Sequence, residues 1–140
     1  MPGIDECLLE AMTVNGARGA AVIEWTSGLA LGMVGEVRDE DPEATAAETA
    51  ELARMAAEQR AFAALGPGSD KSGADPDEGD GESAVEDVIV TTRTCYHLLR
   101  FVDTAFDSGV FFYLWLDRRE GNLALARIRL RDMCGRLALI

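Results

Sequence analysis

The stretch that decides the fold is VFFYLWL, residues 110–116. In a β-strand successive side chains point to opposite faces, so Val110 and every second residue after it would share one face, while the intervening aromatic residues share the other. Both faces would then be apolar, whereas a strand with one solvated face alternates apolar with polar residues. The stretch therefore predicts a strand inside a sheet that helices cover on both faces.

Length and composition predict a single domain over residues 1–140. A chain of 140 residues is long enough for one hydrophobic core and too short for two domains of ordinary size. It has no run of about eighteen apolar residues that could span a bilayer, and the N-terminal MPGIDECLLE lacks the basic and apolar regions of a signal peptide. We therefore expect a cytoplasmic protein without a membrane span.

The three cysteines do not form a disulfide or metal pattern. Cys7, Cys95 and Cys134 are odd in number, far apart in sequence and without a CxxC pair. These features argue against a disulfide framework and against a zinc site. We expect three reduced, buried thiols and no bound metal.

The net charge of -12 is concentrated in one segment. Residues 70–87 contain eight carboxylates and one basic residue, Lys71, whereas residues 118–136 contain six arginines and two acidic residues. Phosphate binding needs a continuous basic surface, and the field of a strongly acidic protein repels a polyanion. The composition therefore argues against nucleic acid as a partner.

Periodicity and turn signals give the order helix, two strands, helix, three strands, helix. Asp41-Pro42-Glu43 marks the start of the second helix, because Asp41 can cap free amides and Pro42 fits the first helical turn. Gly66-Pro67-Gly68 marks its end, and Asn122 is the expected cap of the last helix. The expected helices cover residues 4–14, 41–65 and 123–137, and the expected strands cover residues 18–26, 29–35, 86–93, 95–102 and 110–116.

One stripe of the second helix contains more Ala, Thr and Gln than a deeply buried helix would. Part of this stripe would therefore face another subunit or a partner rather than the core. An ordinary amphipathic helix with a solvated side is the alternative interpretation. The stripe consists of Thr45, Thr49, Leu52, Met55, Ala56, Gln59, Phe62 and Ala63.

Residues 67–84, PGSDKSGADPDEGDGESA, form an acidic insert. They include no aromatic or β-branched residue, so they cannot bury enough surface to offset the entropy of ordering, and we expect a disordered segment. DPDEGDGE superficially resembles a calcium-binding loop. Its glycine falls at the wrong place, and no amphipathic helices bracket a loop of about twelve residues, so we do not expect calcium.

The strand at 86–93 is expected at an edge of the sheet. It begins a meander whose last strand, 110–116, must be central because both of its faces are apolar. An exposed edge rich in β-branched residues tends to pair with other chains. Pairing with a second copy would protect the residues concerned, which are Val88, Ile89, Val90 and Thr91.

The order of the elements, together with several local phrases, resembles the roadblock family of dynein light-chain type, and especially its bacterial members. The matching phrases are GARGA (16–20), SGLA (27–30), YHLLR (96–100) and NLALAR (122–127). They cover the chain except for the acidic insert, which departs from the short connection that is usual in the family.

The resemblance implies an α+β fold with a five-stranded, mainly antiparallel sheet of order 2-1-5-4-3. Two helices would lie on one face and one on the other, as in a profilin-like three-layer sandwich. It also implies a homodimer in which the third strands pair edge to edge and the second helices pack together. The interface residues would be Val88, Ile89, Val90 and Thr91 on the strand, with Leu52, Met55, Gln59 and Phe62 on the helix.

Bacterial relatives often regulate Ras-like small GTPases, so the resemblance implies such a partner. Exposed charged residues of the second helix, Glu51, Arg54 and Glu58, are the candidates for contact with it. The chain has no GxxxxGK[ST] motif, and its single histidine, His97, has no nucleophile motif beside it. We therefore expect a non-enzymatic protein with no catalytic residue and no cofactor.

Two mechanisms and one alternative function stay open. A regulator of GTP hydrolysis can donate an arginine to the transition state, or it can order the switch loops of its partner, which is the more economical mechanism. The alternative function is a dimeric adaptor that joins other components, such as a sensor kinase, without affecting GTP hydrolysis. Candidates for a donated arginine are Arg38, Arg54, Arg60 and Arg93.

Overall fold

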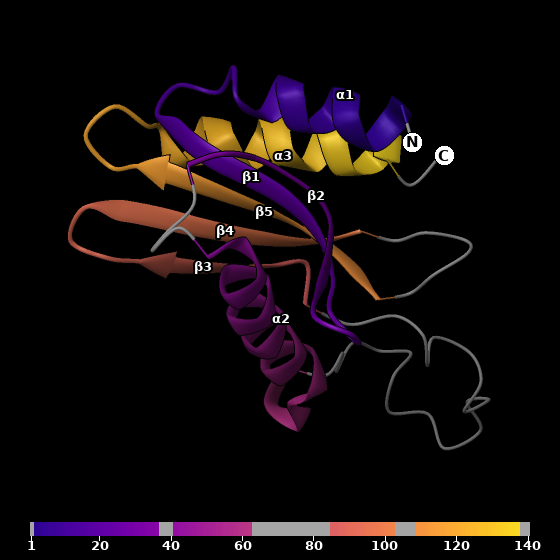
Figure 1. Ribbon diagram of the computed structural model, residues 1–140. Coiled ribbons are helices and arrows are strands. Elements are labelled where there is room, and N and C mark those ends of the chain that lie inside the picture. The colour runs from indigo at the N-terminus through magenta and orange to yellow at the C-terminus, as the bar shows by residue number, and fades with distance from the viewer. Residues whose placement is uncertain (1, 37–40, 63–84, 103–108, 138–140) are drawn as a thin grey trace.

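The computed structural model describes residues 2–36, 41–62, 85–102 and 109–137. Within them a five-stranded sheet lies between two layers of helices (Figure 1). The strand order β2-β1-β5-β4-β3 confirms the order that the resemblance implies, and all neighbouring strands are antiparallel. The strands are β1 (Ala17–Glu24), β2 (Leu29–Gly35), β3 (Asp87–Thr91), β4 (Cys95–Val102) and β5 (Val110–Asp117).

The helices divide between the two faces as expected. Figure 1 shows α1 (Pro2–Ala11) and α3 (Leu123–Leu137) together on one face of the sheet and α2 (Pro42–Glu58) on the other. A short 3-10 helix, η2 (Arg60–Phe62), follows α2. The molecule therefore has the three-layer α+β architecture that the sequence predicts.

β5 is the central strand and supplies both cores. Every residue from Val110 to Leu116 is buried. Phe112 and Leu114 pack with α1 and α3, whereas Phe111, Tyr113 and Trp115 pack in the core under α2. The two-sided apolar pattern is thus explained by a sheet that is covered on both faces.

Side-chain caps begin α2 and α3 where the sequence predicts them. The carboxylate of Asp41 accepts a hydrogen bond from the Ala44 amide (3.1 Å), and the Asn122 side chain accepts one from the Leu125 amide (3.0 Å). The predicted stripe of α3 packs on the sheet. Its members are Leu123, which is half-buried, and Ala126, Leu130, Met133 and Leu137, which are buried.

Several predicted element ends are wrong. α1 ends at Ala11, not at residue 14, β1 ends at Glu24, not at residue 26, and β3 ends at Thr91, not at residue 93. α2 ends at Glu58 instead of near residue 65, because Gln59 takes an extended backbone conformation (φ -76°, ψ 133°) that a helix cannot continue. The predicted stop at 66–68, the acidic insert, Ala63 and Arg38 lie outside the described residues.

The face of α2 that packs on the sheet is also different from the predicted stripe. The buried residues of α2 are Ala46, Ala50 and Ala53. A row of alanines lets the helix axis come close to a sheet whose own side chains, such as Phe111 and Tyr113, are large. The predicted stripe is therefore rotated away from the core, and only part of it is covered by this chain.

Candidate interaction surface

β3 has a partner strand on one side only within the described residues. It pairs with β4 alone. In an antiparallel strand, alternate residues direct their backbone N–H and C=O groups to opposite sides. The Thr92 amide donates to the Cys95 carbonyl (2.8 Å), so the backbone groups of the even-numbered residues face β4. Asp87, Ile89 and Thr91 therefore direct their N–H and C=O groups toward the open edge of the sheet.

The structure brings the four predicted edge residues together. Val88, Ile89 and Val90 are half-buried and Thr91 is exposed. Val88 packs against the core under α2, whereas Ile89 packs against the core of α1 and α3. Their side chains are thus partly covered by this chain, and the backbone of β3 is the part of the edge that stays open.

Asp87, at the start of this edge, is held by two arginines. Its Oδ2 lies 3.1 Å from Arg127 of α3 and 3.5 Å from Arg100 of β4, and Glu86 lies 3.9 Å from Arg100. A negative charge on an edge strand usually hinders pairing with another chain. Here the arginines neutralise it. Sequence reasoning missed this cluster, because its members are 13 to 40 residues apart and only the folded sheet brings them together.

The residues predicted on the second helix do not form one continuous helical stripe. Leu52 is half-buried, and Met55 is 53% exposed. Gln59 is the extended residue after α2, so Phe62, which is 54% exposed, lies on η2 instead of on the helix. Two large apolar side chains, Met55 and Phe62, are nevertheless exposed near the C-terminal end of α2, as an interface would need.

The charged candidates lie on the solvated side of α2. Glu51 and Arg54 form an ion pair one helical turn apart. Glu58 is exposed at the last position of the helix. Arg54 is therefore already held by a neighbour, whereas Arg60 and Arg93 are exposed and have no ion pair within the described residues.

His97 belongs to a ladder of aromatic side chains on the α2 face of the sheet. Its Nδ1 shares a hydrogen bond of 2.8 Å with the Tyr113 hydroxyl, and its ring stacks on Tyr113 and on Trp115 at centroid distances of 5.9 Å and 6.1 Å. The guanidinium of Arg18 lies 4.7 Å from the centre of the Trp115 ring, in a cation–π contact. These contacts give the histidine a structural role within the sheet.

A hollow of about 420 Å³ lies between the first half of α2 and this ladder. The Thr49 hydroxyl in it donates a hydrogen bond to the Thr45 carbonyl of the helix backbone (2.8 Å). No local sequence signal predicts the hollow, because it depends on where α2 crosses the sheet. It is lined by Asp41, Ala44, Thr45, Glu48, Thr49, His97 and Tyr113.

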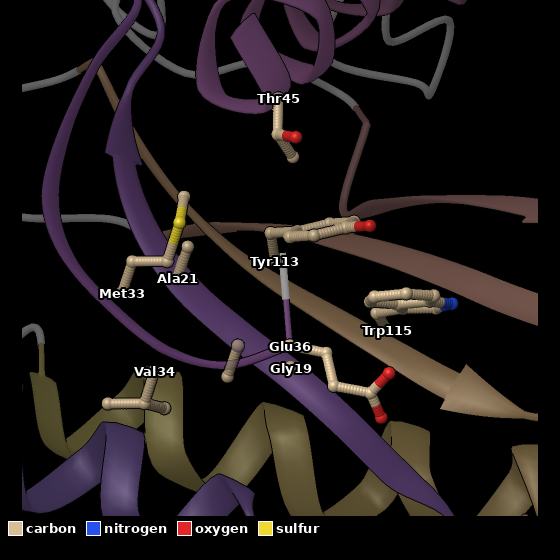
Figure 2. Close-up of a pocket in the computed structure, with 9 residues that line it drawn as sticks. Gly19, Ala21, Met33, Val34, Glu36, Thr45, Tyr113 and Trp115 are labelled. Carbon is tan, nitrogen blue, oxygen red and sulfur yellow. The ribbon is translucent and has the colours of Figure 1, made fainter. Parts of the chain in front are cut away.

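A second, smaller hollow lies under α2 beside the ladder (Figure 2). Figure 2 shows Thr45 of α2 on one side of it and Tyr113 of β5 on the other. Its volume is about 10 Å³, which holds roughly one water molecule. The space is therefore too small for anything much larger than a water molecule.

The three cysteines are buried and free. Burial raises the pKa of Cys134 to about 12 and also raises the pKa of Cys7. Burial of Cys95 acts in the same direction, but hydrogen bonds from Thr94, Trp115 and Arg18 outweigh it and hold its pKa below the ordinary value. The part of the chain that the structure describes contains no group of three metal-ligating side chains and no helix that could cross a membrane.

An open sheet edge and exposed apolar side chains at a helix end are features that protein-interaction surfaces use. The fold is the roadblock fold. The chain is similar in structure to a Roadblock/LC7 domain from Streptomyces avermitilis, with 16% identity and a TM-score of 0.62 over 94% of this chain and 91% of that one.

Two MglB proteins share the fold as well. MglB of Myxococcus xanthus matches with 15% identity and a TM-score of 0.67, over 98% of this chain and 89% of that one. The gliding protein MglB from Thermus thermophilus matches with 16% identity and a TM-score of 0.68, over 98% of this chain and 87% of that one. No protein-family model and no curated protein sequence matches the chain.

Proposed function

We propose that the protein is a non-enzymatic regulatory or scaffold subunit that forms a homodimer and binds a Ras-like small GTPase. The observation that carries this proposal is the open β3 edge, whose one charged residue is neutralised by Arg100 and Arg127. The roadblock fold, and its resemblance to bacterial members of that family, support the class of partner.

In the proposed dimer, β3 pairs with its copy about a two-fold axis that passes beside Ile89. Asp87 then lies opposite Thr91 of the partner subunit, and Ile89 lies opposite the partner's Ile89, so that all outward backbone groups of β3 find a partner. This register keeps the two copies of Asp87 apart. Like charges directly across a strand pair are destabilising, so the register also avoids that cost.

The two-fold axis places both α2 helices on the same side of the joined sheet. When two identical edge strands pair antiparallel, the corresponding faces of the two sheets lie on the same side of the joined sheet. Each α2 covers only one face of its sheet (Figure 1), so both helices lie on that side. The exposed Met55 and Phe62 of each copy would then be available for contact across the axis. The charged side, with Glu51 and Glu58, would face the GTPase.

The proposed mechanism is the ordering of the switch loops of the GTPase. Arg54 is paired with Glu51, so donating its guanidinium would first require this ion pair to break. Of the other predicted arginines in the described residues, Arg60 and Arg93 are exposed. Substituting each of these two by alanine separates the mechanisms, because loop ordering does not require either guanidinium.

Single-turnover hydrolysis of GTP by a Ras-like GTPase from the same genome tests this function. We expect the protein to bind the GTPase and to change the hydrolysis rate by about tenfold or more. Glu58→Lys on α2 should weaken the effect, whereas Glu120→Lys, a matched change at an exposed position after β5, should not. Absence of both binding and a rate change would contradict the proposal, and binding without a rate change would favour the adaptor function.

A further inference from the structure

The other edge of the sheet, β2, is unusually apolar. Its sequence LALGMVG contains no charged residue and no proline, although edge strands normally carry one of these to prevent pairing. Leu29 is 63% exposed and Leu31 is 49% exposed. These exposed leucines do not contribute to the core, so core packing does not explain why the edge strand carries them.

The backbone of β2 is also open on its outer side. It pairs with β1 alone within the described residues. The Trp25 amide donates to the Gly109 carbonyl, so the odd-numbered residues of β1 face β5 and the even-numbered ones face β2. Ala20 and Val22 are paired with Val34 and Gly32, so Met33 between them directs its backbone groups away from β1. The register between β1 and β2 shifts between Val22 and Ile23, so no residue of β1 lies directly opposite Leu31.

The surroundings of this edge are acidic. No Lys or Arg occurs between residues 19 and 37, and Glu24 stands at the turn of the hairpin, whereas Glu36 at its other end is paired with Arg18 at 2.9 Å. α1 lies directly against β2, because a Cβ placed on Gly32 would come within 2.7 Å of Leu8. The same helix exposes Asp5 and Glu6. A ligand for this edge therefore needs apolar side chains in its middle and positive charge at the end that lies beside Glu24.

We propose that the β2 edge binds an extended segment of another protein, which adds to the sheet as a further strand. Such a segment has apolar residues at alternate positions, to cover Leu29 and Leu31, and Lys or Arg at the flank beside Glu24. Backbone hydrogen bonds to Met33 hold it in place. The site is independent of β3, so one dimer could hold two such segments while it binds another partner.

A second copy of this chain is a poor fit for the same edge. Its own β2 lies in the same acidic surroundings, so the two copies would bring like charges together. If copies of the chain paired through β2 as well as through β3, each copy would join two neighbours and the sheet would extend without end. Most oligomers instead form closed assemblies. Charge and symmetry thus both favour a different, basic-flanked partner.

Selection from a phage-displayed library of short random peptides tests the proposal, with the full-length protein as the immobilised target. We expect enriched peptides with alternating apolar residues and a basic flank. Synthetic copies should bind at least about tenfold more weakly to Leu31→Lys than to the unmodified protein. Leu125→Lys, a matched change at an exposed leucine of α3, should leave binding unchanged.

N-methylated peptides test whether the peptide pairs with the backbone of β2. Methylation of the peptide amides that face β2 should abolish binding, while methylation of the alternate set should not. Failure to enrich such peptides, equal binding to Leu31→Lys, or equal effects of the two methylation sets would overturn the proposal. So would sedimentation data in which Leu31→Lys alone converts a dimer to a monomer, since the edge would then bind a second copy.

Discussion

Single side chains of β5 determine how well the two cores are packed. Phe112 is fully buried between the sheet and the helices α1 and α3, and Phe111 is fully buried on the other face. Both could be foreseen from the sequence, since seven apolar residues in a row fit only a strand covered on both faces.

We expect Phe112→Ala to lower the free energy of unfolding by about 3–5 kcal/mol, because it leaves a cavity in a core that cannot collapse around it. Urea denaturation monitored by circular dichroism measures the change. Leu125→Ala, at an exposed position of α3, is the control and should change the stability by less than about 0.5 kcal/mol. A loss below about 1 kcal/mol for Phe112→Ala would mean that the core is loosely packed.

The ion pair of Glu10 and Arg136 joins the two helices of one layer. Two hydrogen bonds of 2.8 Å and 2.6 Å connect their side chains, and they hold the pKa of Glu10 below its ordinary value. The stabilisation is therefore present above the pKa that Glu10 has in the unfolded chain, and it is lost as the pH falls through the lowered pKa of the folded state.

Glu10→Gln should accordingly reduce the loss of stability between neutral and acidic pH. Thermal unfolding of both proteins at a series of pH values measures this. Because the pair is largely solvated, the difference should be small, and it should vanish at the acidic end. Equal curves for the two proteins at all pH values would show that the pair contributes nothing.

At the scale of elements, β3 and α2 differ in how well the sequence predicts them. The edge position of β3 follows from its β-branched residues and from its place in the meander. The end of α2 does not follow, because Ala-rich sequence continues past Glu58 and no local signal marks the extended residue Gln59. The ion pairs of Asp87 depend on α3 and β4, and only tertiary structure brings those elements to it.

Thr91→Pro should weaken self-association by about tenfold or more, since it removes a donor that faces the open edge and leaves the pairing with β4 intact. Thr91→Val, which keeps the amide and the β-branched shape, is the matched control. Dissociation constants from sedimentation equilibrium compare the two. If both variants associate as tightly as the unmodified protein, the dimer does not form through β3.

For the whole molecule, charge is the property that limits which partners it can have. The net charge of -12 opposes contact with nucleic acid and favours basic surfaces. Much of this charge belongs to residues 67–84, which lie outside the described part of the chain.

Replacing residues 67–84 by a short Gly-Ser linker should leave the melting temperature nearly unchanged. Their composition offers almost no apolar surface to bury, and loop closure depends only weakly on loop length. Differential scanning calorimetry measures the effect. A drop of more than about 5 °C would mean that the insert packs on the folded domain.

The proposed role of the β3 edge, and of the α2 helices beside it, depends on the inferred homodimer. Sedimentation velocity of the unmodified protein over a range of concentrations tests this most directly. We predict a species of twice the 15.1 kDa chain mass that persists on dilution into the micromolar range. A single species of 15.1 kDa at every concentration would contradict the proposed dimer.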